Sequence, residues 1–256
     1  MPRRRFRTLL LLALMGLSGA AFAQERPGGK PGVVPMPSVR WHAVLAAGDG
    51  SLPVWDNAVQ RLVAGLDSAG ALAAPPRRLT SSGKQRDLPL ATSDAVLRAV
   101  AALRPGAGEG CLVFVTSHGI PQEGLSMTAS PTRPLTPRAL DAALARGGCA
   151  EAPTLVIISG CYSGDFARLL ARPNRAVMTA SRADRPSFGC GAGFRFTVFD
   201  ECLLDALEAR PALWTEAVAR TRSCVTARER QMNVEPSEPQ ASLGHGVAGL
   251  RAPLSR

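Results

Sequence analysis

Short apolar runs alternate with amphipathic stretches along this chain, and the alternation limits the folds that the chain can adopt. Four of the runs have strand length and little polar interruption: residues 41–47, 111–116, 154–159 and 176–180. Strands that are apolar on both faces are typical of parallel sheets covered by helices on either side. We therefore predict an α/β fold of three layers, in which helices flank a mostly parallel central sheet.

The stretches between these runs have helical periodicity and recognisable ends. Thr136 supplies a hydroxyl cap and Pro137 a suitable first residue, so a helix is predicted to begin there and to end at Gly147-Gly148. Thr92 or Ser93 is expected to cap another helix. The predicted helices cover residues 56–66, 93–103, 137–146, 165–171, 197–209 and 211–230, and two weaker patterns, 78–82 and 241–250, are expected to add short strands.

The first residues carry the pattern of a secretory signal peptide. Four arginines precede an apolar run at residues 9–17, and Ala21 and Ala23 supply the small residues that a signal peptidase requires, so cleavage is expected before Gln24. The run is too short to span about 30 Å of hydrocarbon, so we expect no stable membrane insertion after the signal is removed. The mature protein is predicted to be periplasmic or secreted.

Removal of residues 1–23 would leave 233 residues, enough for one large domain. Residues 24–39 are rich in Gly and Pro and are expected to form a disordered lead, and residues 40–256 the folded domain. The formal net charge falls from +10 to +6, because four arginines leave with the signal. The remaining positive charges are scattered, with few aromatic residues between them, which argues against nucleic-acid binding.

All six cysteines follow the predicted signal peptide, so some should form disulfides in an oxidising compartment. Cys111 and Cys149 each precede a strand, and a bond between them is expected at one end of the sheet. A bond of Cys190 with Cys202 or Cys224 is a second possibility that spacing does not decide. The lack of a C-x-x-C motif and the wide separation of the three histidines argue against a metal site, and nothing calls for an organic cofactor.

Two of the apolar runs end in reactive residues. The run 111–116 continues through Ser117 into His118-Gly119, and the run 154–159 continues into Gly160-Cys161. Sites in open parallel sheets lie beyond the carboxyl ends of the strands. If these strands are parallel neighbours, both side chains emerge at the same edge, and the crossover between them is long enough to allow that arrangement.

These residue types suit nucleophilic catalysis. A thiol is mostly protonated at neutral pH, so a nucleophilic Cys161 needs a base, and His118 is placed to accept the proton and later return it to a leaving amine. The helix predicted after Cys161 would favour a thiolate. Glycines at 119 and 160 allow a substrate backbone to approach, and the amides of Gly119 and Cys161 would hold an oxyanion.

A strand ending in His-Gly, followed by a second ending in a small residue and Cys, resembles the caspases, the legumains and their relatives. The 43 residues from His118 to Cys161 compare with a caspase spacing of about 50. The segment Gly160-Cys161-Tyr162-Ser163-Gly164 looks more like a legumain, as does the stretch 179–190, and 44–50 resembles the first strand and loop of that family. The resemblance covers residues 41–209.

This resemblance implies a caspase-like fold and hydrolysis of peptide bonds through an acyl-enzyme thioester. It also implies that Asp184 and Ser187 lie in a loop lining the pocket for the substrate side chain. Legumains place an arginine after the first strand to bind asparagine, but residues 53–57 contain no basic residue. Asp56 would instead favour a basic or amide side chain, or it is the N-cap of its helix.

Three alternatives remain beside an exported endopeptidase. A transamidase or ligase would use the same two residues, with an amine in place of water to resolve the thioester. A non-catalytic domain of the cell envelope would keep the fold for binding alone. A hydrolase of the serine type with a cysteine nucleophile is less favoured, because only His245 follows the nucleophile. His42 lies at the wrong end of its strand to take part.

Overall fold

A computed structural model describes residues 33–85, 87–131 and 133–255. The predicted signal peptide and residues 24–32 of the predicted lead lie outside the described residues. From Val33 onward the chain forms one compact unit, in which the Met36 amide donates a hydrogen bond to the Gly249 carbonyl at 2.7 Å. Within the described residues, every helix is too short or too polar to cross a membrane.

A six-stranded sheet lies at the centre of the unit, in the order β2-β1-β3-β6-β7-β8. All neighbouring strands are parallel except β8, which pairs antiparallel with β7 at one edge. The mostly parallel sheet is therefore confirmed, and so are the two weaker strands. The strands are β1 (Arg40–Ala47), β2 (Arg77–Thr80), β3 (Glu109–Thr116), β6 (Thr154–Ser159), β7 (Arg175–Thr179) and β8 (Gln240–Leu243), and β4 (Gly119–Ile120) forms a separate hairpin with β5 (Gly124–Leu125).

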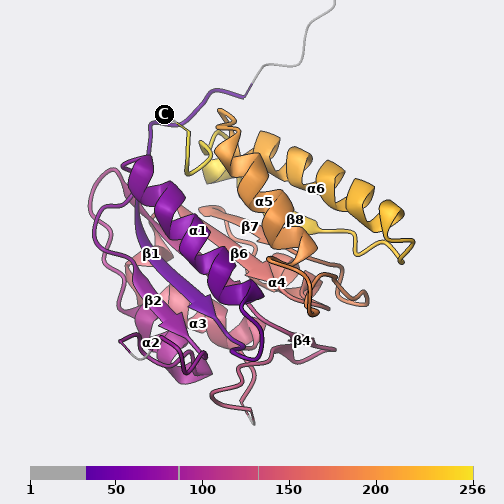
Figure 1. The fold of residues 1–256 in the computed structure, drawn as a ribbon. Helices are drawn as coiled ribbons and strands as arrows, with labels where there is room; N and C mark the ends of the chain where they lie inside the picture. Colours follow the sequence, from indigo (N-terminus) through magenta and orange to yellow (C-terminus); the bar gives the residue numbers. More distant parts are fainter. Residues whose placement is uncertain (1–32, 86, 132, 256) are drawn as a thin grey trace, which may run out of the picture. The chain divides into compact units, whose positions relative to one another are not determined.

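Helices cover both faces of this sheet, as predicted (Figure 1). Each predicted helix is present, with ends that differ by a few residues from those expected. One face carries α1 (Val54–Ser68), α5 (Val198–Glu208) and α6 (Trp214–Gln231), and the other carries α2 (Ser93–Ala101), α3 (Pro137–Arg146) and α4 (Gly164–Leu169), while η1 (Gly148–Ala150) and η2 (His245–Val247) are short 3-10 turns.

The strands alternate their side chains between two cores. In β3, Leu112 and Phe114 pack toward α1 and α5, while Val113 and Val115 pack toward α2 and α3. All four are fully buried, which explains why the strand has no polar face. Thr116, two positions after Phe114 in β3, therefore lies on the face covered by α1, α5 and α6.

The predicted helix caps are confirmed at two positions. The Thr92 hydroxyl accepts a hydrogen bond from the Ala95 amide at 3.1 Å, and the Thr136 hydroxyl accepts one from the Ala139 amide at 3.1 Å. Each hydroxyl satisfies one of the amides that a helix leaves unpaired at its start. Pro137 occupies the first turn of α3 as expected.

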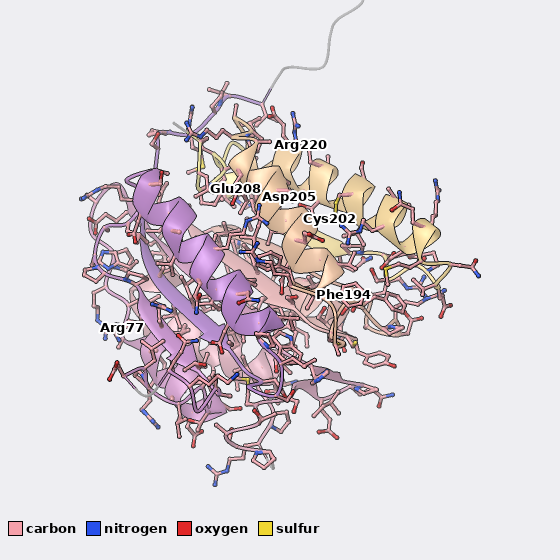
Figure 2. The ribbon with its side chains drawn as sticks, viewed as in Figure 1. Arg77, Phe194, Cys202, Asp205, Glu208 and Arg220 are labelled. Carbon is pink, nitrogen blue, oxygen red and sulfur yellow. A yellow bond between two sulfur atoms is a disulfide. The ribbon has the colours of Figure 1, made fainter. Side chains whose placement is uncertain are left out.

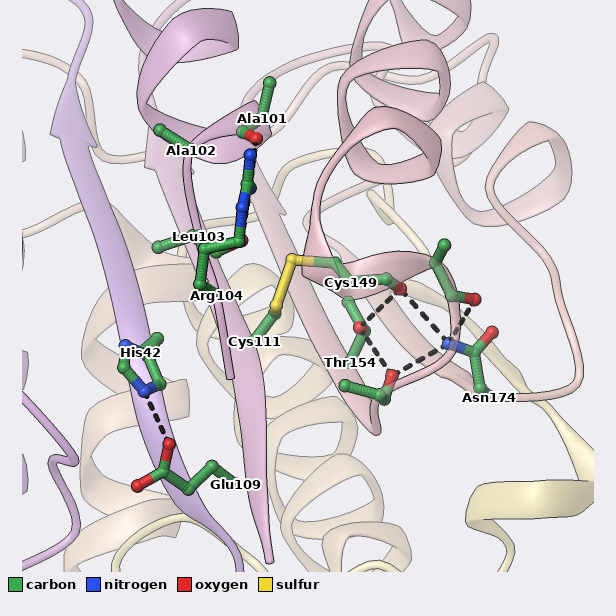
Figure 3. The surroundings of a disulfide bond; sticks show 12 residues. His42, Ala101, Ala102, Leu103, Arg104, Glu109, Cys111, Cys149, Thr154 and Asn174 are labelled. Carbon is green, nitrogen blue, oxygen red and sulfur yellow. Dashed lines mark hydrogen bonds and ion pairs between the residues drawn. A yellow bond between two sulfur atoms is a disulfide. The ribbon is translucent and has the colours of Figure 1, made fainter. Parts of the chain in front are cut away.

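The disulfide between Cys111 and Cys149 is confirmed, and Figure 3 shows its surroundings. It joins the start of β3 to the turn before β6, at the end of the sheet away from His118 and Cys161. The carbonyl of Cys149 accepts a hydrogen bond from Asn174 at 3.2 Å, so this end of the sheet is also tied to β7.

The predicted pairing of Cys190 is wrong. Cys202 and Cys224 bond to each other, with their Cα atoms 5.6 Å apart, and Cys190 is free. The physical reason is that α5 and α6 pack side by side, so Cys202 on α5 faces its partner on α6 (Figure 2), whereas Cys190 lies in the loop before α5.

Candidate active site

The two reactive residues follow the ends of adjacent parallel strands. Thr116, the last residue of β3, is paired with Ser159, the last residue of β6. The pairing continues one step further, because the Ser117 amide donates to the Ser159 carbonyl at 2.9 Å. His118 and Cys161 are therefore delivered to the same edge of the sheet, as the sequence predicted.

Gly119 and Gly160 bring the two strand ends into direct contact. A Cβ atom added to Gly119 would overlap the carbonyl oxygen of Cys161 and lie 2.9 Å from its amide nitrogen. A Cβ atom on Gly160 would lie 2.9 Å from the Ser117 carbonyl oxygen. The backbone after His118 thus packs against the backbone of Cys161, and glycine is required for this approach.

Cys161 forms no disulfide, and the residue is partly exposed. Its sulfur contacts Ser187. It accepts a hydrogen bond from the Ser187 amide at 3.2 Å, and it donates one to the Ser187 carbonyl at 3.4 Å. The Ser187 hydroxyl is 3.7 Å from the sulfur. The loop after β7 therefore contacts the sulfur through both the amide and the carbonyl group of Ser187.

The backbone around Cys161 is held in an uncommon conformation. Tyr162 has a φ of 55°, which bulky residues rarely adopt, and its amide donates to the Arg185 carbonyl at 2.8 Å. The buried hydroxyls of Ser163 and Ser181 both donate to the Gly160 carbonyl, at 2.8 and 3.1 Å. These bonds hold the loop that carries Cys161 in place, and strain of this kind is frequent at functional sites.

The helix expected to support the thiolate is short. It is α4, which has six residues and begins at Gly164, three positions after Cys161. The donor that reaches the sulfur is the Ser187 amide, which comes from the loop after β7. The two residues are 26 positions apart in the chain, and the sequence pattern did not predict their contact.

The ring of His118 packs against Trp55, near the start of α1. The two rings meet edge to face, with centroids 4.8 Å apart and an interplanar angle of 67°. The His118 carbonyl accepts a hydrogen bond from the Ser126 amide at 2.8 Å. Both the side chain and the backbone of His118 are thus positioned, and the role of Trp55 was missed by sequence reasoning because a tryptophan in an apolar helix suggests only core packing.

Helix α1 is in turn fixed to α5. Arg61 donates hydrogen bonds to Asp205 at 2.6 Å and to Glu208 at 2.6 Å, and both acceptors are labelled in Figure 2. The pKa of Arg61 is raised, first by its hydrogen bond with Glu208. This exposed cluster links the helix that carries Trp55 to its neighbour in the same layer.

Asp56 does not cap α1, so that part of the prediction is wrong. The helix begins with Pro53 at its N-cap, and Asp56 is its third residue. Its buried carboxyl group accepts a hydrogen bond from the Thr80 hydroxyl at 2.7 Å, at the end of β2. Burial raises the pKa of Asp56, and the Thr80 hydrogen bond opposes that rise. Asp56 also lines a surface hollow of about 250 Å³ beyond the ends of β1 and β2.

Asp184 is exposed and ion-paired. Arg182 donates to both of its carboxylate oxygens, at 2.8 and 2.5 Å, and the hydrogen bond from Arg182 holds the pKa of Asp184 below its usual range. Arg182 also donates to Glu238 at 3.1 Å. The loop that contains Asp184 and Ser187 is therefore anchored to the chain before β8.

Cys190, the second free thiol, lies close enough to interact with Cys161. Burial is the first cause that raises its pKa, and the charge of Cys161 is the second. The pKa of this thiol is therefore raised where a nucleophile would need it lowered.

The other histidines lie apart from this edge. His42 hydrogen-bonds Glu109 at 2.7 Å, near the amino ends of β1 and β3 (Figure 3), and His245 is exposed in η2. Among the described residues, no group of three or more His, Cys, Asp or Glu side chains could hold a metal ion.

A buried carboxyl group near this edge was also missed. Asp200 in α5 is fully buried and accepts a hydrogen bond from the Thr116 hydroxyl at 2.7 Å. A charged residue among the apolar positions of a helix is the sequence signal that could have identified it.

Two solved structures that share this fold are caspases. The structure of caspase-1 from Spodoptera frugiperda superposes with a TM-score of 0.56 at 12% identity, covering 85% of this chain and 94% of that one. The structure described as pro-sf-caspase-1 has a TM-score of 0.56 at 12% identity, with 81% and 92% covered. The caspase-like fold is therefore confirmed.

Comparison of the sequence with curated proteins gave no match. The model of the peptidase C13 family matches residues 93–230, more than half of the chain, and the match includes His118, Cys161 and Ser187. The chain therefore belongs to the peptidase C13 (legumain) family and is a cysteine peptidase of caspase-like fold.

Proposed function

We propose that this protein is an exported endopeptidase in which Cys161 is the nucleophile and His118 the general acid and base. The observation that carries the proposal is the contact between the two strand ends, where the backbone at Gly119 packs on the backbone of Cys161. Such a contact keeps the imidazole and the thiol within one small region. The Ser187 amide, which donates to the sulfur at 3.2 Å, helps to hold the side chain of Cys161 in place.

In the first step, His118 takes the proton of Cys161 and the sulfur attacks the carbonyl carbon of the scissile bond. The negative charge that develops on the carbonyl oxygen is held by the amides of Gly119 and Cys161, and each such donor is often worth about 3 kcal/mol. His118 then gives its proton to the leaving amine, which yields the thioester.

In the second step, His118 accepts a proton from water, which attacks the thioester and releases the carboxylic acid with the free thiol. Trp55 supports both steps, because its edge-to-face contact limits rotation of the imidazole ring. An amine in place of water would give a transamidase product from the same thioester, and product analysis distinguishes the two outcomes.

The substrate side chain is proposed to enter beside Ser187, whose amide, carbonyl and hydroxyl groups all approach the sulfur. Asp56 and Asp184 are proposed to add negative charge around this region, favouring a basic or amide side chain. Their carboxyl groups already bond Thr80 and Arg182, so substrate contact requires these bonds to be shared.

The proposed compartment is the periplasm or the medium. Support comes from the bonds of Cys111 with Cys149 and of Cys202 with Cys224, because structural disulfides persist in oxidising compartments.

Alkylation with iodoacetamide tests the dyad without a known substrate. Under non-reducing conditions, mass spectrometry with peptide mapping should find rapid single labelling at Cys161 and slow labelling at Cys190, whose pKa is raised by burial. His118→Ala should remove the rapid phase, and Cys190→Ser should keep it. Cleavage of labelled, denatured casein should be lost in Cys161→Ala.

Two outcomes would overturn the proposed function. One is equal labelling of Cys161 in the wild type and His118→Ala, which would mean that the thiol is not activated by the histidine. The other is a wild-type protein that neither reacts rapidly nor cleaves casein, which would leave a binding domain on a peptidase fold.

A further inference from the structure

A buried carboxyl group is bonded to the end of the strand that carries His118. Asp200 is the third residue of α5 and has no exposed surface. Its Oδ2 accepts a hydrogen bond from the Thr116 hydroxyl at 2.7 Å, and its amide donates to the Thr197 hydroxyl at 3.0 Å. Thr116 is the last residue of β3, two positions before His118. The carboxyl group therefore joins the start of α5 to the end of a catalytic strand.

The same group also lies near the second catalytic strand. Thr116 is paired with Ser159, which is two positions before Cys161 on β6. The hydroxyls of Thr116, Ser159 and Thr197 all favour the ionised form of Asp200. The Oδ1 atom, however, has no hydrogen-bond partner among the described residues. The carboxyl group is therefore held by the hydrogen bond that Thr116 donates to Oδ2.

This placement is unfavourable for folding. Burial raises the pKa of Asp200 to about 6, and no cation contributes to that pKa. At the other end of the sheet, the buried Arg175 is paired directly with Asp141. An unpaired carboxyl group inside a protein is expensive, so its position beneath both strand ends calls for a function.

A second carboxyl group shows the same local arrangement. Asp56 is the third residue of α1, and its carboxyl group accepts a hydrogen bond from Thr80, the last residue of β2. In both cases an aspartate in the first turn of a helix fixes the end of a strand. Only the strand bonded by Asp200 leads to a residue of the dyad.

We propose that Asp200 is a positioning residue of this peptidase, which fixes through Thr116 the place where β3 delivers His118 beside Cys161. The inference rests on the proposed function of His118 and Cys161. Asp200 itself makes no hydrogen bond to either of them, and it acts on the strand end through Thr116. A displacement of about 1 Å at a reacting group can lower a rate about 100-fold, so a small shift of this strand end has a large effect.

Ionised Asp200 accepts the hydrogen bond from the Thr116 hydroxyl and carries no proton that would need an acceptor. When the carboxyl group is protonated, one oxygen becomes a donor, and the arrangement of the three hydroxyls around it must change. Ionisable residues near these strand ends include Asp49 after β1, His118 after β3, Cys161 after β6 and Arg182 after β7, and the first turns of α1 and α5 add Asp56 and Glu201. None of these groups contributes to the raised pKa of Asp200.

Two pairs of variants test the proposal. Asp200→Asn keeps the shape of the side chain and removes its ionisation, and Glu201→Gln is the control at the next position of the same helix, where the carboxylate pairs with Arg228. Thr116→Val removes the donor hydroxyl, and Thr116→Ser keeps it. The rate of Cys161 alkylation by iodoacetamide and the rate of casein cleavage are measured for each, from pH 5 to pH 8, together with urea unfolding.

At pH 7.5, Asp200→Asn and Thr116→Val are expected to lower both rates by about 10- to 100-fold. Thr116→Ser and Glu201→Gln should stay within about twofold of the wild type. The ratio of wild-type to Asp200→Asn rates should rise as pH increases through about 6, since the wild-type carboxyl group ionises there. Urea unfolding should show Asp200→Asn at least as stable as the wild type at pH 7.5, which excludes misfolding as the cause.

The proposal is overturned if Asp200→Asn keeps wild-type rates, if the ratio does not change with pH, or if Thr116→Ser is as damaging as Thr116→Val. A wild-type protein without a rapidly reacting Cys161 overturns the proposed function and this inference together. An active wild type with an unaffected Asp200→Asn variant overturns this inference alone.

Discussion

Trp55 lies edge to face against His118, with their ring centroids 4.8 Å apart, and so connects helix α1 to the catalytic edge of the sheet. The indole ring is fully buried, and its Nε1 has no hydrogen-bond partner among the described residues. Its contribution at this place therefore comes from the ring and not from the N–H group. The tryptophan holds the imidazole from the side of α1, while the Ser126 amide holds the backbone.

Substitutions of Trp55 should distinguish the contribution of its ring from that of its N–H group. Trp55→Ala leaves a large cavity, and we expect it to lower the free energy of unfolding by about 3–5 kcal/mol. Trp55→Phe keeps an aromatic contact and removes a buried unpaired donor, so its loss should be smaller. The rate of Cys161 alkylation, measured on folded protein, should fall about fivefold in Trp55→Ala, in line with the loss of an aromatic contact worth about 1 kcal/mol. Equal rates in Trp55→Ala and the wild type would show that the indole does not position His118.

Gly119 is the position where an added methyl group should do the most damage. Gly119→Ala places a Cβ atom on the carbonyl oxygen of Cys161, so the two strand ends must move apart. We expect at least a 100-fold loss of casein cleavage. Gly191→Ala is the matched control, because a Cβ atom there meets nothing within 4 Å. Cleavage by Gly119→Ala at the wild-type rate would contradict the close packing of Gly119 on Cys161.

Much of the fold could be predicted because its signals are local. The strand at residues 154–159 was predicted with its observed bounds, since an unbroken apolar run next to turn residues has few other interpretations. Thr136 was identified as a cap by its position before helical periodicity, and the cap of α2 was narrowed to Thr92 or Ser93, of which the structure shows Thr92. The edge formed by His118 and Cys161 followed from parallel topology alone.

The parts that could not be predicted depend on contacts between distant segments. The Ser187 amide reaches Cys161 only because the loop after β7 folds back, and the bond of Cys202 with Cys224 depends on how α5 packs on α6. Asp56 illustrates the same limit. An aspartate near a helix start suggests a cap, but its carboxyl group bonds Thr80 on a strand 24 residues away.

The disulfide between Cys111 and Cys149 should stabilise the protein without affecting the reaction. It closes 38 residues, for which loop entropy gives about 4 kcal/mol, and it lies at the end of the sheet opposite Cys161. In urea, the Cys111→Ser, Cys149→Ser double variant should unfold more easily by about that amount. The fraction still folded should alkylate at Cys161 at the wild-type rate. A slower rate in folded protein would show that the two ends of the sheet are coupled.

Asp200 should give the folded protein a characteristic dependence of stability on pH. Its pKa is about 6 in the folded chain and near the ordinary 3.8 when unfolded, so between these values the folded state retains a proton that the unfolded state releases. Stability contributed by this group is therefore present below about pH 4 and is lost as pH rises through 6.

The total loss corresponds to about 3 kcal/mol. Asp200→Asn has no such ionisation, so relative to the wild type it should gain about that amount between pH 4 and pH 7 in urea unfolding. A constant difference across this range would mean that Asp200 ionises near its ordinary pKa and is not desolvated as the structure implies. A gain in stability together with a loss of Cys161 reactivity would show that the carboxyl group serves the reaction at the expense of the fold.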